Sequence, residues 1–426
     1  MTLARYSLIA SAVLALAACG QQQNTEQPKQ DPNAAKPAAD AKPADAGGEA
    51  VVKIGHAAPL TGNIAHLGKD NENGARLAID ELNAKGVEIG GKKVKFELLS
   101  EDDQGDPKTA TTVAQRFVDA KVAGVVGHLN SGTTIPAAKI YSDAGIPQIS
   151  PSATNPDYTK QGFKTAFRVI ANDIAQGKAL GDFAVDNLKA KKIAIIDDRT
   201  AYGQGLADEF EKAAKGKGAE IVKREFTNNQ ATDFMAILTS IKGAKPDVVF
   251  YGGMDAQAGP MAKQMKKLGI AAKLLGGDGF QSGEFIKLAG DAAEGQFASQ
   301  PGLAKDKMPG YADFNTKYKA KFNTDIQIYA PYTYDATMLM VEAMKKANST
   351  DSKVYLPELA KIEYSGVTGP VKFDEKGDVV GGTVTVYQVK GGKWEVMASV
   401  GGAAAPAAAA PAEAKPAEAK KEEKKQ

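Results

Sequence analysis

Short apolar segments alternate with segments of helical period along most of this chain, and this alternation limits the folds that the chain can adopt. Apolar strands are expected at residues 51–57, 94–99, 122–127, 147–150, 192–197, 220–226, 247–251 and 273–276. The segments between them repeat apolar residues at helical spacing, as Ala75, Ala78 and Leu82 do. Strands that alternate with helices predict parallel sheets with helices on both faces.

The alternation occurs in two blocks, which a long helical segment near residues 174–188 separates. Further helices are expected near residues 311–322 and 332–346, and short strands at residues 369–373 and 383–389. Each block is long enough to build its own sheet. We therefore predict an α/β fold with two doubly wound parallel-sheet lobes that face each other across a cleft.

The single cysteine of the 426-residue chain is informative by its position. The first residues, MTLARYSLIASAVLALAACG, combine Arg5 with a short apolar run that ends in small residues before Cys19. This pattern predicts a signal peptide over residues 1–18 and an exported protein. It also resembles a bacterial lipobox, which implies a lipid on Cys19 that anchors the protein to a membrane in the periplasm or at the cell surface. An ordinary signal peptide with a coincidental cysteine is the alternative.

Two terminal segments lack the large apolar residues that a folded core needs. Residues 19–50 are rich in Gln, Asn, Pro, Ala, Lys and Asp, and we expect a flexible tether there. Residues 401–426 are rich in Ala, Pro, Lys and Glu, and we expect a disordered tail. The formal net charge of +2 gives no indication of a nucleic-acid partner.

Two clusters of hydroxyl residues follow neighbouring strands, at the strand ends where open α/β sheets bind ligands. Residues 131–134 lie where a strand turns into a helix, and Ser152-Ala153-Thr154 follows the next strand. Free N–H groups and the dipole of a helix N-terminus favour an anion, and hydroxyls add further donors. The two clusters together indicate a site for a small carboxylate. For Ser131 or Thr133 alone, a helix N-cap is the alternative.

The second block carries a candidate partner for a positive charge. Asp278 lies within Gly276-Gly277-Asp278-Gly279-Phe280, where glycines allow close approach of a ligand to the backbone. Its carboxylate could accept charge-assisted hydrogen bonds from an ammonium group, or it could be an ordinary turn residue. Tyr202 and Tyr329 could supply aromatic walls or belong to the core.

Several stretches resemble the periplasmic branched-chain amino acid binding proteins, the Leu/Ile/Val receptors of ABC importers. They include GHAAPLTGNIAHLGKDNENGARLAIDELNAKG, VVGHLNSGTTIPAAKIYSDAGIPQISPSATNP, AIIDDRTAYGQGLA and DVVFYGGMDAQ, and the resemblance covers nearly everything between the tails. It implies a type I periplasmic-binding fold whose lobes are joined by three crossovers. The implied ranges are residues 51–170 plus 301–380 for lobe 1, and 171–300 plus 381–400 for lobe 2.

The resemblance also implies roles for particular residues. Contacts to the α-carboxylate fall on Ser131 and Thr154, and contacts to the α-ammonium fall on the Ser152 carbonyl, the Thr154 hydroxyl and Asp278. The aromatic positions of the second lobe and of the late segment fall on Tyr202 and near Tyr329. Three departures leave the side-chain specificity open: Leu67 and Met254 stand at positions that are often aromatic, and Asp278 stands where Glu is common.

Other classes of protein are less consistent with the sequence. No Ser-His-Asp order, H-E-x-x-H motif or P-loop is present, so we expect neither an enzyme nor a metal or cofactor. His56 and His66 lie in the first loop of the predicted cleft, where they could contact a ligand or serve packing or surface roles. Two alternatives keep a binding role: a receptor of the same fold for another amino acid, an amide or a urea-type solute, and a surface adhesin. We expect a monomer that delivers its ligand to a membrane permease.

Overall fold

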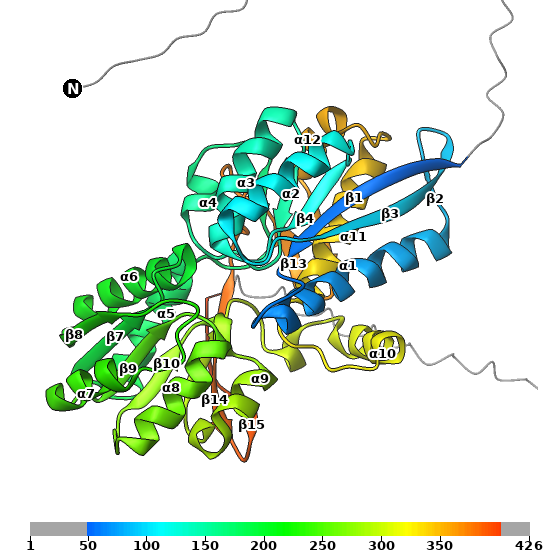
Figure 1. The fold of residues 1–426 in the computed structure, drawn as a ribbon. Helices are drawn as coiled ribbons and strands as arrows, with labels where there is room; N and C mark the ends of the chain where they lie inside the picture. Colours follow the sequence, from blue (N-terminus) through cyan, green and yellow to red (C-terminus); the bar gives the residue numbers. More distant parts are fainter. Residues whose placement is uncertain (1–48, 402–426) are drawn as a thin grey trace, which may run out of the picture. The chain divides into compact units, whose positions relative to one another are not determined.

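Six strands form the first sheet within residues 49–401, the part of the chain that the computed structural model describes. Their order is β2-β3-β1-β4-β5-β6, with bounds β1 (Ala50–Ala58), β2 (Val87–Ile89), β3 (Lys92–Asp102), β4 (Gly124–Gly127), β5 (Gln148–Ser150) and β6 (Ala166–Arg168). One face is covered by α1 (Ala65–Lys85), α11 (Ala330–Lys346) and α12 (Ser352–Ala360). The other face is covered by α2 (Pro107–Asp119) and α3 (Ser131–Ala144), as Figure 1 shows.

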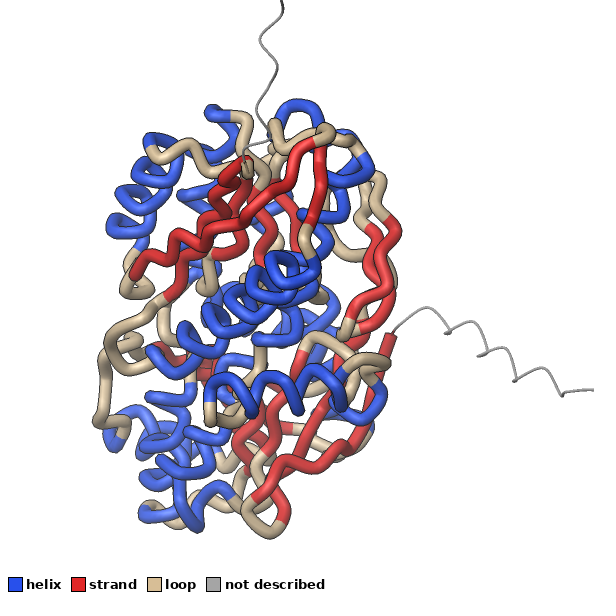
Figure 2. Tube along the Cα trace, turned by 90° about the vertical axis from the view of Figure 1, so that its right-hand side faces the viewer, coloured by secondary structure: helices blue, strands red, loops and turns tan. Residues whose placement is uncertain are grey.

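Seven strands form the second sheet in the described part of the chain, in the order β15-β14-β11-β10-β9-β7-β8. Their bounds are β7 (Lys192–Asp197), β8 (Glu220–Phe226), β9 (Val248–Gly252), β10 (Lys273–Gly276), β11 (Phe297–Gln300), β14 (Thr383–Lys390) and β15 (Lys393–Gly401). Helices α5 (Asp173–Asp186) and α6 (Ala201–Gly216) cover one face. The other face is covered by α7 (Met235–Ala244), α8 (Asp255–Lys267) and α9 (Gly283–Ala289). Figure 2 shows the strands of both sheets in red with blue helices against them.

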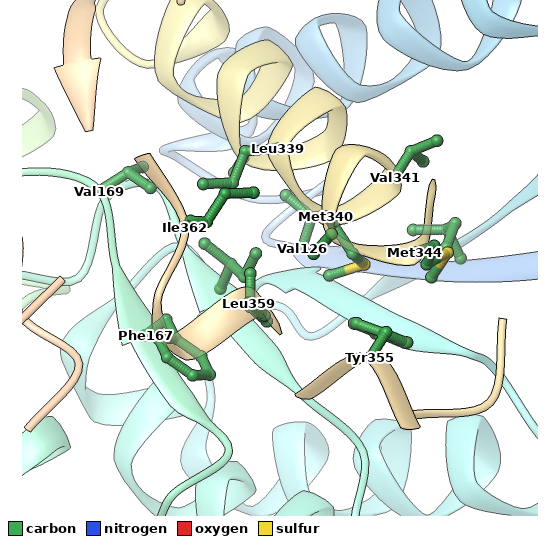
Figure 3. Packing of buried hydrophobic residues seen from close by; sticks show 14 of the residues in the cluster. Val126, Phe167, Val169, Leu339, Met340, Val341, Met344, Tyr355, Leu359 and Ile362 are labelled. Atoms are coloured by element: carbon green, nitrogen blue, oxygen red, sulfur yellow. The ribbon is translucent and has the colours of Figure 1, made fainter. Parts of the chain in front are cut away.

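The central strands are apolar on both faces, which explains why helices cover both sides of each sheet. In β7, Ile195 packs in the core with α5 and α6, and Ile196 packs in the core with α7 to α9. Such strands are typical of sheets that are buried on both faces, where each fully buried aliphatic side chain contributes roughly 1.5–3 kcal/mol. Figure 3 shows the same packing in the first lobe, where Leu339 of α11 lies in one cluster with Leu359 of α12 and Val126 of β4.

The chain passes between the two sheets three times within residues 49–401. The passages follow β6 and β11, and the last one separates β14 from the small hairpin of β12 (Glu363–Gly366) and β13 (Gly369–Lys372). The remaining helices of the described residues are α4 (Asp157–Lys160), α10 (Tyr311–Phe322) and the short 3-10 turns η1 (Asp278–Phe280), η2 (Gly290–Ala293) and η3 (Lys305–Lys307). None of the helices of this part of the chain combines the length and the hydropathy that a membrane span needs. The predicted signal peptide, Cys19, the tether up to residue 48 and the tail from residue 402 lie outside the described residues.

The predicted alternation is confirmed for the central strands, but the sheet edges differ from the expected all-parallel arrangement. Strands β2 and β3 are antiparallel, and so are β11, β14 and β15. The loops Gly90-Gly91 and Gly391-Gly392 join two of these pairs, and all four glycines have positive φ between 56° and 73°. Two-residue loops of this conformation join antiparallel neighbours, whereas parallel strands need a long crossover. Both glycine pairs are a hairpin signal in the sequence.

One buried carboxylate fixes the N-terminus of α11 to α1. Asp70 of α1 is only 2% exposed. Its Oδ1 accepts hydrogen bonds from the hydroxyl of Tyr318 and its two oxygens accept from four successive backbone N–H groups, at 2.7–3.0 Å, of Gln327, Ile328, Tyr329 and Ala330. A carboxylate at a helix N-terminus satisfies N–H groups that have no partner within the helix. The contact therefore positions α11 and the Tyr329 side chain that precedes it.

We predict that Asp70→Asn lowers the free energy of unfolding by roughly 2–4 kcal/mol, because charge-assisted hydrogen bonds are lost and buried N–H groups lose their acceptor. Urea denaturation of the full chain measures this change. Asp143→Asn is the matched control, since Asp143 is 63% exposed and forms an ion pair with Lys139 on the surface. The control should change stability by less than about 0.5 kcal/mol. Equal effects of both substitutions would contradict the role of Asp70.

Candidate functional site

In the first sheet, the chain places β3 on one side of β1 and then β4 on the other side. In the second sheet, it places β8 on one side of β7 and then β9 on the other side. Open α/β sheets bind ligands at such switch points, beyond the carboxyl ends of the strands. A cavity of about 440 Å³ lies there, and both lobes contribute to its walls. Its lining includes Ile64 after β1, Asn130 after β4, Thr200 after β7 and Met254 after β9. The switch points of both sheets therefore open into one space.

The first predicted hydroxyl cluster lies next to this cavity, whose lining includes Asn130 and Gly132 on either side of Ser131. Ser131 is the first residue of α3, and its Oγ accepts a hydrogen bond from the N–H of Asn155 at 3.2 Å. The Ser152 hydroxyl donates to the carbonyl of Leu129 at 3.0 Å. The Thr154 hydroxyl is fully buried and has no hydrogen-bond partner among residues 49–401. Ser131 Oγ only accepts a hydrogen bond, so within residues 49–401 the Ser131 and Thr154 hydroxyls both have an O–H that could donate to a ligand.

The alternative that Ser131 is only an N-cap does not match the geometry. The N-cap residue of α3 is Asn130, and no side chain caps the helix there. The Asn130 Oδ1 atom itself is buried without a partner in the described part of the chain. The first N–H groups of α3 thus have no side-chain acceptor, a situation that favours an anion.

Asp278 is the centre of a hydrogen-bond network that joins three elements. Its Oδ1 accepts from the Gln176 amide of α5 at 2.9 Å and from the Tyr202 hydroxyl of α6 at 3.0 Å. Its Oδ2 accepts from the Tyr329 hydroxyl, before α11, at 2.6 Å. Burial raises the pKa of Asp278, and these hydrogen bonds act against that rise. The structure thus brings together Asp278, Tyr202 and Tyr329, three residues that the sequence singled out.

The glycines next to Asp278 serve a purpose other than the predicted one. We expected them to let a ligand approach the backbone. A side chain at Gly277 would collide with Leu206 and the Tyr202 hydroxyl, and one at Gly279 would collide with the carbonyl of Gly253 and with Tyr202. The glycines therefore make room for Tyr202, which donates to Asp278 and accepts from the Gly279 N–H at 2.9 Å.

A second carboxylate of the site was not identified from the sequence. Asp173 is the first residue of α5, its N–H donates to the carbonyl of Thr154 at 2.9 Å, and its side chain is fully buried. Neither carboxylate oxygen makes a well-formed hydrogen bond within residues 49–401. Burial raises the pKa of Asp173 to about 8, the nearby Thr154 hydroxyl and Gln176 amide act against this rise, and the charge of Asp278 adds to it. Arg168 lowers this pKa, but its guanidinium is already bonded to Asp378 at 2.6 Å.

The sequence carries little signal for Asp173, because an acidic residue in the first turn of a helix is usually explained by the helix dipole. Asn172 before it caps α5 by accepting from the N–H of Ala175 at 3.3 Å. A neighbouring residue thus performs the capping that a helix start requires, and Asp173 is left without that role. Only the tertiary contact with Thr154 places it in the site.

An apolar wall lies next to these polar groups. Leu67 and Met254, the two departures from the aromatic pattern, are buried and belong to one hydrophobic cluster with Tyr202 and Tyr329. Leu67 comes from α1 and Met254 from the N-terminus of α8, so both lobes contribute to the wall. Ala153 is buried too, and its carbonyl accepts from Arg168 at 2.9 Å. Of the nine predicted binding residues, Tyr202 and Met254 line the cavity between the lobes. The other seven are buried next to it or elsewhere in the core, and a role for them in binding stays a prediction.

His56 does not lie in the cleft loop, where the sequence placed it. It belongs to β1, is fully buried, and its Nδ1 lies 3.1 Å from the Ser100 hydroxyl on the neighbouring strand. Burial lowers the pKa of His56 to about 4, so it is a neutral core residue. Within the described residues, no group of three His, Cys, Asp or Glu side chains is arranged to hold a metal ion.

A two-lobe α/β fold with polar groups at the switch points of both sheets defines the class of solute-binding proteins. The model of a family described as periplasmic binding protein matches residues 51–393, so the chain belongs to this family. The family is one of non-catalytic solute-binding proteins, and the expectations of a type I fold and of no enzymatic activity are confirmed.

Individual relatives extend this result. The Leu/Ile/Val-binding protein homolog 1 of Brucella abortus is 38% identical over 329 residues, which cover 77% of this chain and 87% of that protein. The leucine-, isoleucine-, valine-, threonine-, and alanine-binding protein of Pseudomonas aeruginosa is 34% identical, with 79% and 89% covered. The crystal structure of the branched-chain amino acid transporter substrate binding protein LivJ of Streptococcus pneumoniae with isoleucine has a TM-score of 0.75 and 31% identity, with 82% and 99% covered.

We predict that Asp173→Asn flattens the pH dependence of stability in the ligand-free protein. The pKa of Asp173 is about 8 in the folded protein, whereas a free Asp titrates near about 3.9. Ionisation therefore destabilises the folded state increasingly as the pH rises between these values. At the upper end of this range the variant should be roughly 1–3 kcal/mol more stable than the wild type.

Urea denaturation at a series of pH values measures this difference. Asp157→Asn is the control, because the Asp157 side chain is 71% exposed. If the stability of Asp173→Asn depended on pH in the same way as that of the wild type, the pKa of Asp173 would not be raised in the folded protein.

Proposed function

We propose that this protein is an extracytoplasmic receptor that binds an amino acid, with a branched-chain side chain preferred, between its two lobes and delivers it to the permease of an ABC importer. One observation carries the proposal: Asp173 and Asp278 are buried in one site, and within residues 49–401 neither has a cation as its hydrogen-bonded partner. Burial raises the pKa of both carboxyls, because their ionised forms lack a cation, and an α-ammonium group would supply one.

The other half of the site supports an α-carboxylate as the second ligand group. The uncapped N-terminus of α3 and the Ser131 hydroxyl would donate to it, together with the unpartnered Thr154 hydroxyl. The Ser152 carbonyl would accept from the ammonium. In this proposal Tyr202 and Tyr329 orient Asp278 and close the site over the ligand.

The apolar wall supports a branched-chain side chain, since Leu67 and Met254 offer flexible aliphatic surface in place of rings. The relatives named for leucine, isoleucine and valine agree with this preference. A different amino acid is the second candidate, and one observation favours it. Beyond the wall, the cavity is lined by polar side chains, among them Gln104, Asn130 and Gln257. A hydroxyl or amide on the ligand could bond there.

We predict that leucine, isoleucine or valine stabilises the full mature chain after it has been refolded to remove bound ligand. At about a hundred times its Kd, a ligand should add roughly 2.7 kcal/mol to the free energy of unfolding. Asp278→Asn should reduce affinity for every amino acid by at least about 2 kcal/mol, because the ammonium loses a charged partner. Leu67→Ala should weaken the branched-chain ligands but leave alanine nearly unchanged.

Thermal unfolding against the twenty amino acids, followed by calorimetry, makes these measurements, with Asp157→Asn as the surface control. If another amino acid gives the largest shift, the receptor stands and the branched-chain preference is wrong. If no amino acid shifts the midpoint, the proposed zwitterion site is wrong. An amide or urea-type solute would then be the next ligand to test, and an adhesin the next class of protein to consider.

We also propose that the protein is exported, is held at a membrane by a lipid on Cys19, and works as a monomer whose lobes are residues 51–170 plus 301–380 and residues 171–300 plus 381–400. The support is the lipobox pattern before Cys19. The native chain should incorporate labelled fatty acid and partition with membranes, and Cys19→Ser should abolish both. Equal labelling of the two proteins would refute the anchor.

A further inference from the structure

An ion pair joins the two lobes beside the site, and neither partner is among the proposed ligand contacts. His66 of α1 lies with its Nε2 2.6 Å from Oδ2 of Asp255, the first residue of α8. The side chain of His66 is 25% exposed, whereas that of Asp255 is fully buried. Helix α1 packs on the first sheet and α8 on the second, so the contact forms only when the lobes are closed.

The pair is directly connected to the apolar wall of the ligand site. His66 precedes Leu67 in α1, and Asp255 follows Met254 at the start of α8. Leu67 and Met254 pack in one cluster across the lobes. Formation of the ion pair therefore coincides with closure of the wall around a ligand side chain.

The Asp255 carboxylate has one hydrogen-bond partner on each lobe. Its Oδ2 accepts the Ser282 hydroxyl at 2.5 Å in addition to His66, and its Oδ1 has no partner within residues 49–401. His66 is its only ion-pair partner in the described part of the chain. When the lobes separate, Asp255 keeps the Ser282 hydroxyl of its own lobe and loses its cation.

The charges around His66 come from three helices and all favour its protonated form. Burial by itself lowers the pKa of His66, but the hydrogen bond and charge of Asp255 on α8 outweigh it, with further contributions from Glu284 on α9 and Asp70 on α1. The pKa of His66 is therefore raised in the closed arrangement. Opening removes Asp255 and Glu284 and leaves Asp70, so this pKa falls when the lobes separate.

We propose that His66 and Asp255 form a proton-dependent latch, which holds the lobes closed over a bound amino acid when His66 is protonated. The proposal rests on the proposed function, because it concerns closure of the same site. The closed form binds the proton more tightly than the open form, so closure takes up protons. The latch is fully present below the pKa of His66 in the open form and is lost as the pH rises through the higher pKa of the closed form.

One further contact between the lobes, from Tyr329 to Asp278, involves a carboxyl whose pKa burial raises, whereas two others do not titrate. The Asn155 amide donates to the carbonyl of Ala201 at 2.6 Å, and the Asn63 amide donates to that of Asn229 at 3.3 Å. Neither amide titrates. Two acids of the site do titrate in the same range, because burial raises the pKa of Asp173 to about 8 and that of Asp198 to about 6. The effect of His66 must therefore be measured as a difference between wild type and variant.

Calorimetry with the amino acid that binds tightest, at about pH 6 and about pH 8.5, tests the latch in the full chain. When the pH is lowered from about 8.5 to about 6, the affinity of the wild type should change relative to that of His66→Gln by roughly three- to tenfold, in favour of tighter binding by the wild type. Asp255→Asn should behave like His66→Gln, and Asp291→Asn, an 84% exposed acid on the same lobe, should behave like the wild type. Parallel pH profiles of wild type and His66→Gln would overturn the proposal.

A measurement without ligand separates failure of the latch from failure of the proposed function. Proton NMR titration of the His66 ring in the ligand-free chain should give a lower pKa in Asp255→Asn than in the wild type. Spin labels on the two lobes should show a closed population that increases at low pH in the wild type and less in His66→Gln. An unchanged His66 pKa, or equal populations in both proteins, would refute the latch even if no amino acid binds.

Discussion

The Asp70 carboxylate accepts hydrogen bonds from four successive N–H groups where the chain enters α11. This interaction joins α1, whose first turns carry Leu67 and His66, to the segment that carries Tyr329. Tyr329 in turn donates to Asp278, so one buried carboxylate in the first lobe positions the donor to another at the site. Because a buried anion needs all of its donors, this arrangement leaves little freedom for α11 to shift.

Inside the cleft, two buried carboxyl groups lack the backbone donors that stabilise Asp70, so burial there destabilises the folded protein. Asp173 and Asp278 are buried close enough that the charge of Asp278 raises the pKa of Asp173, and neither is bonded to a basic side chain. Such an arrangement lowers the stability of the empty closed form. An ammonium ligand would remove that cost, so closure would be favourable chiefly when the correct charge is bound.

Much of the fold was readable from residue patterns, and the errors have identifiable causes. The apolar strands and amphipathic helices of both blocks were predicted because burial on two faces demands them. The antiparallel edges were missed although Gly90-Gly91 and Gly391-Gly392 mark them. Ser131, Thr154 and Asp278 were found because they follow strands, whereas Asp173 was missed because a helix start explains an acid equally well. His56 was misplaced because the first cleft loop was taken to begin at His56, within the predicted strand 51–57, whereas β1 continues to Ala58.

The sequence by itself determined the two-lobe α/β architecture and the polar residues at the strand ends, since hydrophobic period and loop position are local properties of the chain. Only the tertiary structure decided which of those residues share a site. It brought Tyr329 into hydrogen-bonding contact with Asp278, 51 residues away in the sequence, and His66 with Asp255, 189 residues away. It also brought the Thr154 hydroxyl next to the Asp173 carboxyl, and neither makes a well-formed hydrogen bond within residues 49–401. Burial and pairing of charges depend on which segments meet in space, and a pattern along the chain does not contain that information.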